Sequence, residues 1–93
     1  MPEYGYTIID NAIFRDSRLS AKAKGLYCQM LSLPDNWEYS KAGLTTLFKD
    51  ELISIESGLN ELKKYGYLEI IQKRKPNGRI YYEYIIKKVS EPP

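Results

Sequence analysis

The hydrophobic positions between residues 20 and 32 predict the first of three helices. Its apolar residues recur at three, four, seven and eight residues, the spacing of a one-sided amphipathic helix: Ala23, Leu26, Tyr27, Met30 and Leu31. Ser20 is a favoured N-cap residue, and Pro34 disfavours helix in the residue before it. We therefore expect a helix that begins after Ser20 and runs through Ser32.

Two further helical patterns follow along the chain. Ser40 can cap a short helix over 41–48, whose inward-facing residues would be Leu44, Leu47 and Phe48. Ser54 can cap a third helix, in which apolar residues recur at intervals of four and three: Ile55, Leu59 and Leu62. Gly66 is the expected residue just beyond the end of this helix.

Strand-forming residues predict a sheet made from both ends of the chain. Residues 6–9 form a short first strand before the Asp10-Asn11 turn signal, and 67–72 and 80–86 form two more. Asn77-Gly78 tolerates positive φ and predicts an antiparallel hairpin, with the first strand completing the sheet. The result is one α+β domain over 1–93, ordered over about 6–88, with 89–93 as a tail or the start of a linker.

Composition narrows the chemistry that the chain can perform. A chain of 93 residues, 43% of them hydrophobic, forms one small globular domain, and its apolar runs are too short to span a membrane. It contains no histidine, and its single cysteine, Cys28, falls in a helical apolar pattern as a structural thiol. Asp50-Glu51 suits a solvated turn better than a metal or acid–base pair. We expect a cytoplasmic protein without catalytic activity or cofactor.

The order of strand, three helices and a two-stranded hairpin is that of a winged helix-turn-helix. Residues 6–16, Leu19 to Leu26 and Met30 to Trp37 resemble the start of bacterial and phage replication-initiation proteins. The run from Gly58 to Leu68 is similar to the helix-to-wing junction of the same group. The chain thus resembles the winged-helix N-terminal domains of phage replisome organisers and DnaD-type primosome proteins. The resemblance implies DNA binding in replication initiation, with DNA and replication proteins as partners.

The third helix carries the first set of candidate DNA-binding residues. Its face opposite the apolar row holds Ser57, Asn60, Glu61 and Lys64, with Ser54 near the edge. Asn60 suits adenine, the two serines can bond to either kind of base group, and Lys64 suits phosphate or guanine. A solvated surface with a Glu61–Lys64 pair is the alternative, and the nearby acids at positions 50, 51 and 56 repel phosphate.

The hairpin carries the second set of candidate DNA-binding residues. Although the net charge is only +2, residues 60–93 hold a net +4 and residues 1–59 a net −2. The wing residues that concentrate this charge are Lys73, Arg74, Lys75, Asn77 and Arg79. Such a tip can contact a phosphate backbone. Alternatively, it is a basic edge that deters sheet-to-sheet aggregation.

The tyrosines of the last strand have two possible roles, in binding or in core packing. Tyr82 and Tyr84 share one face of their strand, and Tyr81 lies on the other. Exposed tyrosines can stack on single-stranded bases or form a subunit interface, whereas buried ones pack the core. Trp37 and Tyr39 are expected to pack their loop onto the core.

Two functions therefore stand side by side. The first is a duplex-DNA-binding module that uses the third helix and the wing. The second is a protein-interaction module, for self-association or for recruitment of replication proteins, favoured by the acidic start of the third helix and by the tyrosines.

Overall fold

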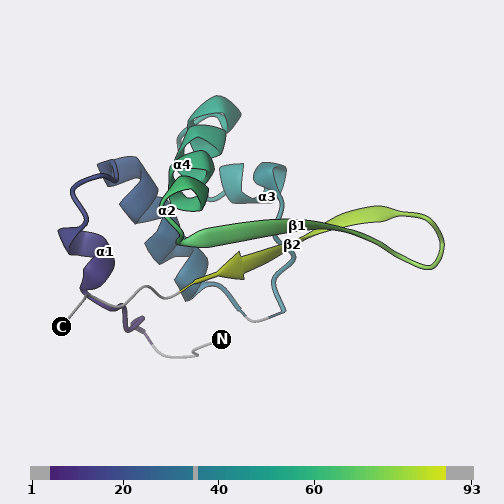
Figure 1. The fold of residues 1–93 in the computed structure, drawn as a ribbon, viewed down its shortest axis with the longest axis horizontal. Coiled ribbons are helices and arrows are strands. Elements are labelled where there is room, and N and C mark those ends of the chain that lie inside the picture. The colour runs from purple at the N-terminus through teal and green to yellow at the C-terminus, as the bar shows by residue number, and fades with distance from the viewer. Residues whose placement is uncertain (1–4, 35, 88–93) are drawn as a thin grey trace.

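The described part of the protein consists of four helices followed by a β-hairpin. The structure is a computed structural model, described here over residues 5–34 and 36–87. The helices are α1 (Ala12–Arg15), α2 (Ala21–Ser32), α3 (Lys41–Thr45) and α4 (Leu52–Lys64), and the strands are β1 (Leu68–Arg74) and β2 (Ile80–Ile86). Figure 1 shows the hairpin projecting from one side of the helices. This layout confirms the predicted α+β winged helix-turn-helix, while the predicted tail, 89–93, lies outside the described residues.

The predicted first strand is wrong. Residues 6–9 have no regular secondary structure, and within the described residues the sheet contains β1 and β2 only. Asp10 does not begin a turn between strands; its carboxylate accepts a hydrogen bond from Ala12 N, 2.8 Å away, at the start of the unpredicted helix α1. Strand-forming residues make a strand only where a partner edge is available, and Ile8 is left 83% exposed.

The caps predicted for α2 and for the end of α4 are confirmed. Ser20 Oγ accepts a hydrogen bond from Ala23 N (3.1 Å) at the start of α2. At the end of α4, Gly66 has a φ of +86°, with hydrogen bonds from Gly66 N to Lys63 O and from Tyr67 N to Leu62 O. This is a Schellman motif, and the left-handed residue at its centre turns the chain directly into β1.

Two predicted helix bounds are wrong. The helix expected over 41–48 ends at Thr45, because Leu47 N and Phe48 N bond three residues back, to Leu44 O and Thr45 O, in tight turns. The α4 helix begins at Leu52, earlier than Ser54, with Glu51 at the N-cap position but without a side-chain capping bond.

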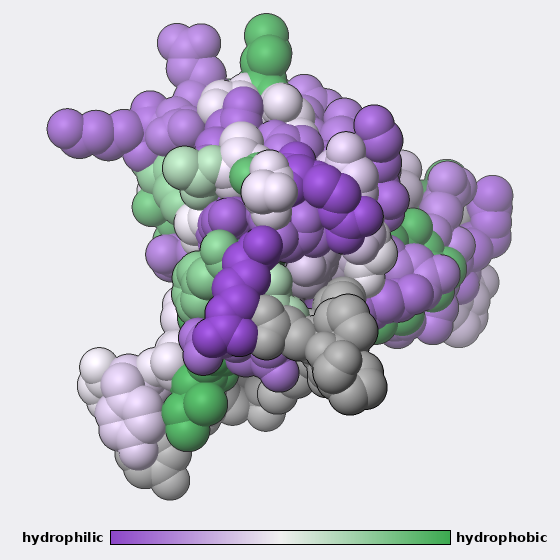
Figure 2. Space-filling model, turned by 60° about the vertical axis from the view of Figure 1, so that its left-hand side comes forward, coloured by the Kyte–Doolittle hydropathy of each residue, from purple (hydrophilic) through white to green (hydrophobic). Residues whose placement is uncertain are grey.

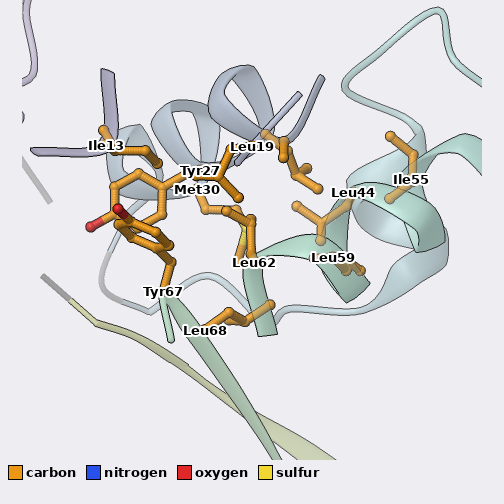
Figure 3. Packing of buried hydrophobic residues seen from close by; sticks show 12 residues of the cluster. Ile13, Leu19, Tyr27, Met30, Leu44, Ile55, Leu59, Leu62, Tyr67 and Leu68 are labelled. Carbon is orange, nitrogen blue, oxygen red and sulfur yellow. The ribbon is translucent and has the colours of Figure 1, made fainter. Parts of the chain in front are cut away.

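The core lies where α2, α4 and the base of the hairpin meet. Figure 3 shows the buried side chains packed together: Ile13, Leu19, Tyr27, Met30, Leu44, Ile55, Leu59, Leu62, Tyr67 and Leu68. The α2 and α4 helices approach closely at Gly58, where a Cβ atom would lie 3.0 Å from Leu26 Cδ2. Tyr27 and Tyr67 meet edge to face, with ring centroids 5.6 Å apart.

The hairpin is confirmed, but its turn differs from the two-residue turn implied by Asn77-Gly78. The strands pair from Leu68 with Ile86 to Arg74 with Ile80. Gly78 N bonds to Lys75 O, and within this turn only Gly78 has positive φ (+85°). Pro76-Asn77-Gly78 therefore form a three-residue loop with Gly78 in the left-handed position. Every residue from 72 to 82 is exposed, so the outer hairpin extends beyond the core.

Candidate nucleic-acid interface

The outward face of α4 carries three of the four residues predicted there. Ser57, Asn60 and Lys64 are exposed, on the side of the helix away from the buried row of Ile55, Gly58, Leu59 and Leu62. Ser54 is half-buried at the edge of this face, where its hydroxyl donates to Asp50 Oδ2 (3.1 Å). Sequence reasoning missed Ile53, which is 79% exposed on the same face. The helical periodicity places Ile53 on the face opposite the buried row, and this signal could have identified it from the sequence.

The Glu61–Lys64 pair of the alternative interpretation does not form among the described residues. Glu61 turns toward the start of α2, where its carboxylate accepts hydrogen bonds from Ser20 N (2.8 Å) and Ser20 Oγ (2.7 Å). These bonds lower the pKa of Glu61. Lys64 Nζ lies 5.3 Å from the centroid of the Tyr65 ring and remains available on the outward face.

A second polar cluster lies at the same, carboxyl-terminal end of α4. The Asp16 carboxylate accepts two hydrogen bonds from the Arg18 guanidinium and one from Tyr67 OH (2.9 Å), while Arg18 packs 4.5 Å from the Tyr65 ring centroid. The bonds from Arg18 hold the pKa of Asp16 well below its usual value, and burial together with Asp16 raises the pKa of Tyr67 to about 12. With Ser20 and Glu61, this cluster fixes the orientation of α4.

Charge changes sign along α4. Asp50 and Glu51 lie at its start, whereas Lys63 and Lys64 occupy its last turn. Between them, Glu56 forms an ion pair with Lys41 of α3 (3.1 Å). The carboxyl-terminal half of the outward face is therefore the part that attracts an anion.

The wing cations differ in how far they are engaged. Lys73 pairs with Glu83 (3.1 Å), Arg74 donates to Gly78 O (3.3 Å), and Lys75 lies 5.6 Å from the Tyr81 ring centroid. Among the described residues, the Arg79 guanidinium has no hydrogen-bond or ion-pair partner. The Asn77 side chain stabilises the turn, because its oxygen accepts a hydrogen bond from Arg79 N (3.0 Å). Within the described residues, three of the four cations, Arg74, Lys75 and Arg79, thus have no carboxylate partner.

The loop before α3 packs on the core as predicted. Trp37 and Tyr39 meet edge to face (5.0 Å), Tyr39 stacks on Tyr84 (5.4 Å, 16°), and Tyr39 OH donates to Met30 O. The predicted alternation in β2 is also present, since Tyr82 and Tyr84 pair with Gln72 and Ile70 on the face that continues to the core. Tyr84 is half-buried there, whereas Tyr82 is 54% exposed.

Two hollows lie between this loop, the helices and the hairpin. One, of about 690 Å³, is lined by residues 37–40, Lys75 and residues 81–84 of β2; the other, of about 510 Å³, lies between β1, β2, the start of α3 and the end of α4. Figure 2 shows the helical side of the molecule, where hydrophilic surface predominates and hydrophobic groups are scattered. Within residues 5–34 and 36–87, no group of three or more acidic, cysteine or histidine side chains could hold a metal ion.

Three helices with a tight turn between α3 and α4, followed by a hairpin, define a winged helix-turn-helix protein. A family model described as a helix-turn-helix domain matches residues 17–68, more than half of the chain. The chain therefore belongs to this helix-turn-helix family, which points to DNA binding. The match ends as β1 begins, so it covers α2, α3 and α4 but little of the wing. No curated protein and no solved structure matches the chain. No helix in the described part is long and apolar enough to span a membrane.

Proposed function

We propose that this domain binds duplex DNA, with the outward face of α4 in the major groove and the wing on the phosphate backbone. The observation that carries the proposal is the exposed row of Ser57, Asn60 and Lys64 on the second helix of a helix-turn-helix, opposite its buried row. A B-form major groove admits one α-helix, and this is the helix that the motif commonly presents to it.

Each residue of the row has a role suited to its chemistry. The Asn60 amide can bond to both edge groups of adenine, and the Ser57 hydroxyl can donate or accept. Exposed Ile53 supplies an apolar contact for a thymine methyl group. Lys64 contacts a phosphate or guanine. Its positive charge is available for this contact because the Glu61 carboxylate is bonded to Ser20 instead.

The wing supplies contacts that do not depend on base sequence. Arg74, Lys75 and Arg79 are exposed and lack a carboxylate partner within the described residues, whereas Lys73 is partly neutralised by Glu83. Neutralising phosphates releases counterions, so binding should weaken steeply with salt. The wing therefore adds affinity and orientation, while α4 adds base preference.

The sequence resemblance supports a place in replication initiation. In this role the domain would help a phage or bacterial replisome-organising or primosome protein to engage duplex DNA in the cytoplasm. Replication proteins would then be its further partners.

The test is fluorescence anisotropy with a random duplex across a salt series. R74A/R79A removes two phosphate contacts, so the slope of log affinity against log salt should become shallower by about 2. K24A/K87A, which removes two cations away from the wing tip, is the matched control and should keep the original slope. Equal slopes for the two variants would refute the role of the wing, and wild-type protein that binds no duplex would refute the function.

A second candidate function is a protein-interaction module. Leu52 and Ile53 are 44% and 79% exposed beside Asp50 and Glu51, an apolar and acidic surface that repels phosphate. Ile8 and the tyrosine face of β2 are further candidate contacts for self-association. Sedimentation should then show a dimer fraction that rises with protein concentration and is lost in the I53D variant. A monomer at all concentrations would exclude self-association.

A further inference from the structure

The two hollows beside the hairpin adjoin each other, and we call them together the aromatic trough. They share Ser40, Tyr82 and Tyr84 in their walls. Five of the nine residues that line the larger hollow are aromatic: Trp37, Tyr39, Tyr81, Tyr82 and Tyr84. The trough lies beside β2 and the carboxyl-terminal end of α4, and it does not include Ser57 or Asn60 of the outward face.

The aromatic walls combine fixed rings with accessible ones. Trp37 and Tyr39 are held in place by their mutual contact, by the stack on Tyr84 and by the bond from Tyr39 OH to Met30 O. Tyr81 and Tyr82, by contrast, are 40% and 54% exposed. Among the described residues, no backbone hydrogen bond joins 36–40 to β2, and the two segments meet through side chains such as the stack of Tyr39 on Tyr84.

Lysines stand at both ends of the trough. Lys75 lies at its wing end, and Lys41 and Lys63 lie at its helix end. Lys41 and Glu83 are each engaged in ion pairs, with Glu56 and Lys73. Within the described residues, Lys63 and Lys75 have no carboxylate partner, and Glu38 is the acid in the walls that remains unpaired. The cations are therefore spaced apart with aromatic rings between them.

We propose that the aromatic trough binds single-stranded nucleic acid. The bases stack on Tyr82 and the neighbouring rings, and the phosphates reach Lys63 and Lys75. Proteins that hold an unpaired strand combine aromatic rings with cations in this way, because every base has a stacking face and every linkage a negative charge. In a duplex the base faces are covered by their neighbours, so this site goes beyond the proposed duplex function.

Trp37 provides a direct probe, because it is the only tryptophan in the chain and lines the trough. Its emission, excited where DNA does not absorb, is followed as a twelve-nucleotide oligothymidine is added. The expected result is saturable quenching in the micromolar range, absent with an abasic phosphodiester strand of equal length. No change with oligothymidine, or equal quenching by the abasic strand, would overturn the proposal.

Variants then test the assigned contacts. Y82A should weaken oligothymidine binding by roughly 5- to 150-fold, the effect of one lost stacked base, whereas Y82F should bind almost as wild type. K63A/K75A should make the salt slope shallower by about 1.4. Y6A, which removes another exposed tyrosine outside the trough, is the control for a general loss of aromatic surface. Equal affinity of Y82A and wild type, with unchanged circular dichroism in both, would refute stacking on Tyr82.

The two nucleic-acid sites can be separated. N60A and R74A/R79A should weaken duplex binding and leave oligothymidine binding intact, and Y82A should do the reverse. Oligothymidine binding without duplex binding would refute the proposed function alone, and the converse would refute the trough alone. Quenching of Trp37 by an acidic peptide but not by oligothymidine would show a protein-docking groove and overturn the inference.

Discussion

Glu61 shows how one side chain can leave a candidate surface to serve the fold. In a capping box, a glutamate three residues inside the helix bonds back to the N-cap backbone. Ala23 occupies that position in α2, and Glu61 of α4 supplies the carboxylate from 41 residues away. The i, i+3 helical rule pairs Glu61 with Lys64 because it considers only neighbours on the same helix. The actual partner, Ser20, lies far away in the sequence, so a local rule cannot identify it.

The consequence is a defined loss of stability. Glu61→Ala should lower the free energy of unfolding at pH 7 by about 2 kcal/mol, because it removes a charged acceptor from two part-buried donors. The folded-state pKa of Glu61 lies below the usual 4.5, so its stabilisation is present above that pH and is lost as pH falls through the folded pKa. Urea unfolding of variant and wild type across this range measures the difference.

Glu69→Ala is the matched control for Glu61→Ala. Its carboxylate pairs with Lys87 at 3.4 Å, and both side chains are 49% exposed. Such a surface pair contributes about 0–1 kcal/mol. A Glu61 variant as stable as the Glu69 variant, or a difference from wild type that does not shrink as the pH is lowered, would contradict the capping role.

At the scale of elements, the helices and hairpin could be predicted where the signal is local. Ser20 and Gly66 act through neighbours within a few residues, and the Asn77-Gly78 pair fixes a hairpin even though its turn contains three residues. The segment 6–9 could not be predicted, because a strand needs an edge that only the folded sheet defines. Likewise, the helical period places Ser57 and Asn60 on the outward face of α4. The stack of Tyr39 on Tyr84 could not be predicted, because it joins two segments that are distant in the sequence.

Two glycines give opposite predictions for the same substitution. Gly66→Ala should lower the free energy of unfolding by about 1 kcal/mol, because its φ of +86° is unfavourable for a residue with a Cβ atom. Gly25→Ala should raise it by up to about 1 kcal/mol, since Gly25 is exposed inside α2 and an added Cβ meets nothing within 4 Å. Thermal and urea unfolding report both: a Gly66→Ala variant as stable as wild type would contradict this account of the Schellman motif, and a destabilised Gly25→Ala variant would contradict the propensity argument for α2.

At the scale of the whole molecule, stability and binding occupy different regions. The buried residues gather around α2, α4 and the base of the hairpin, and the molecule extends to 45 Å in its longest dimension. The outer hairpin contributes charge but no buried side chain. Figure 1 shows the same division, with the wing tip far from the helices. The wing can therefore change its contacts without changing the core.

Shortening the wing tests this division. Lys75 N bonds to Arg79 O, and directly bonded pairs alternate along an antiparallel ladder, so Lys73 and Tyr81 form the next such pair inward. Replacing residues 74–80 by Asn-Gly closes a two-residue turn on that pair. The variant loses two exposed cross-strand pairs, Arg74 with Ile80 and Lys75 with Arg79, and should keep its free energy of unfolding within about 2 kcal/mol of wild type.

Binding should respond differently to the shortened wing. The variant lacks three cations, so the salt slope for duplex DNA should become shallower by about 3, and the affinity at low salt should fall. An Asn60→Ala variant with the full wing should instead keep the slope and lose preference among duplex sequences. A shortened variant that fails to fold would show that the wing supports the core, and one that keeps the wild-type slope would assign all phosphate contacts to the helices.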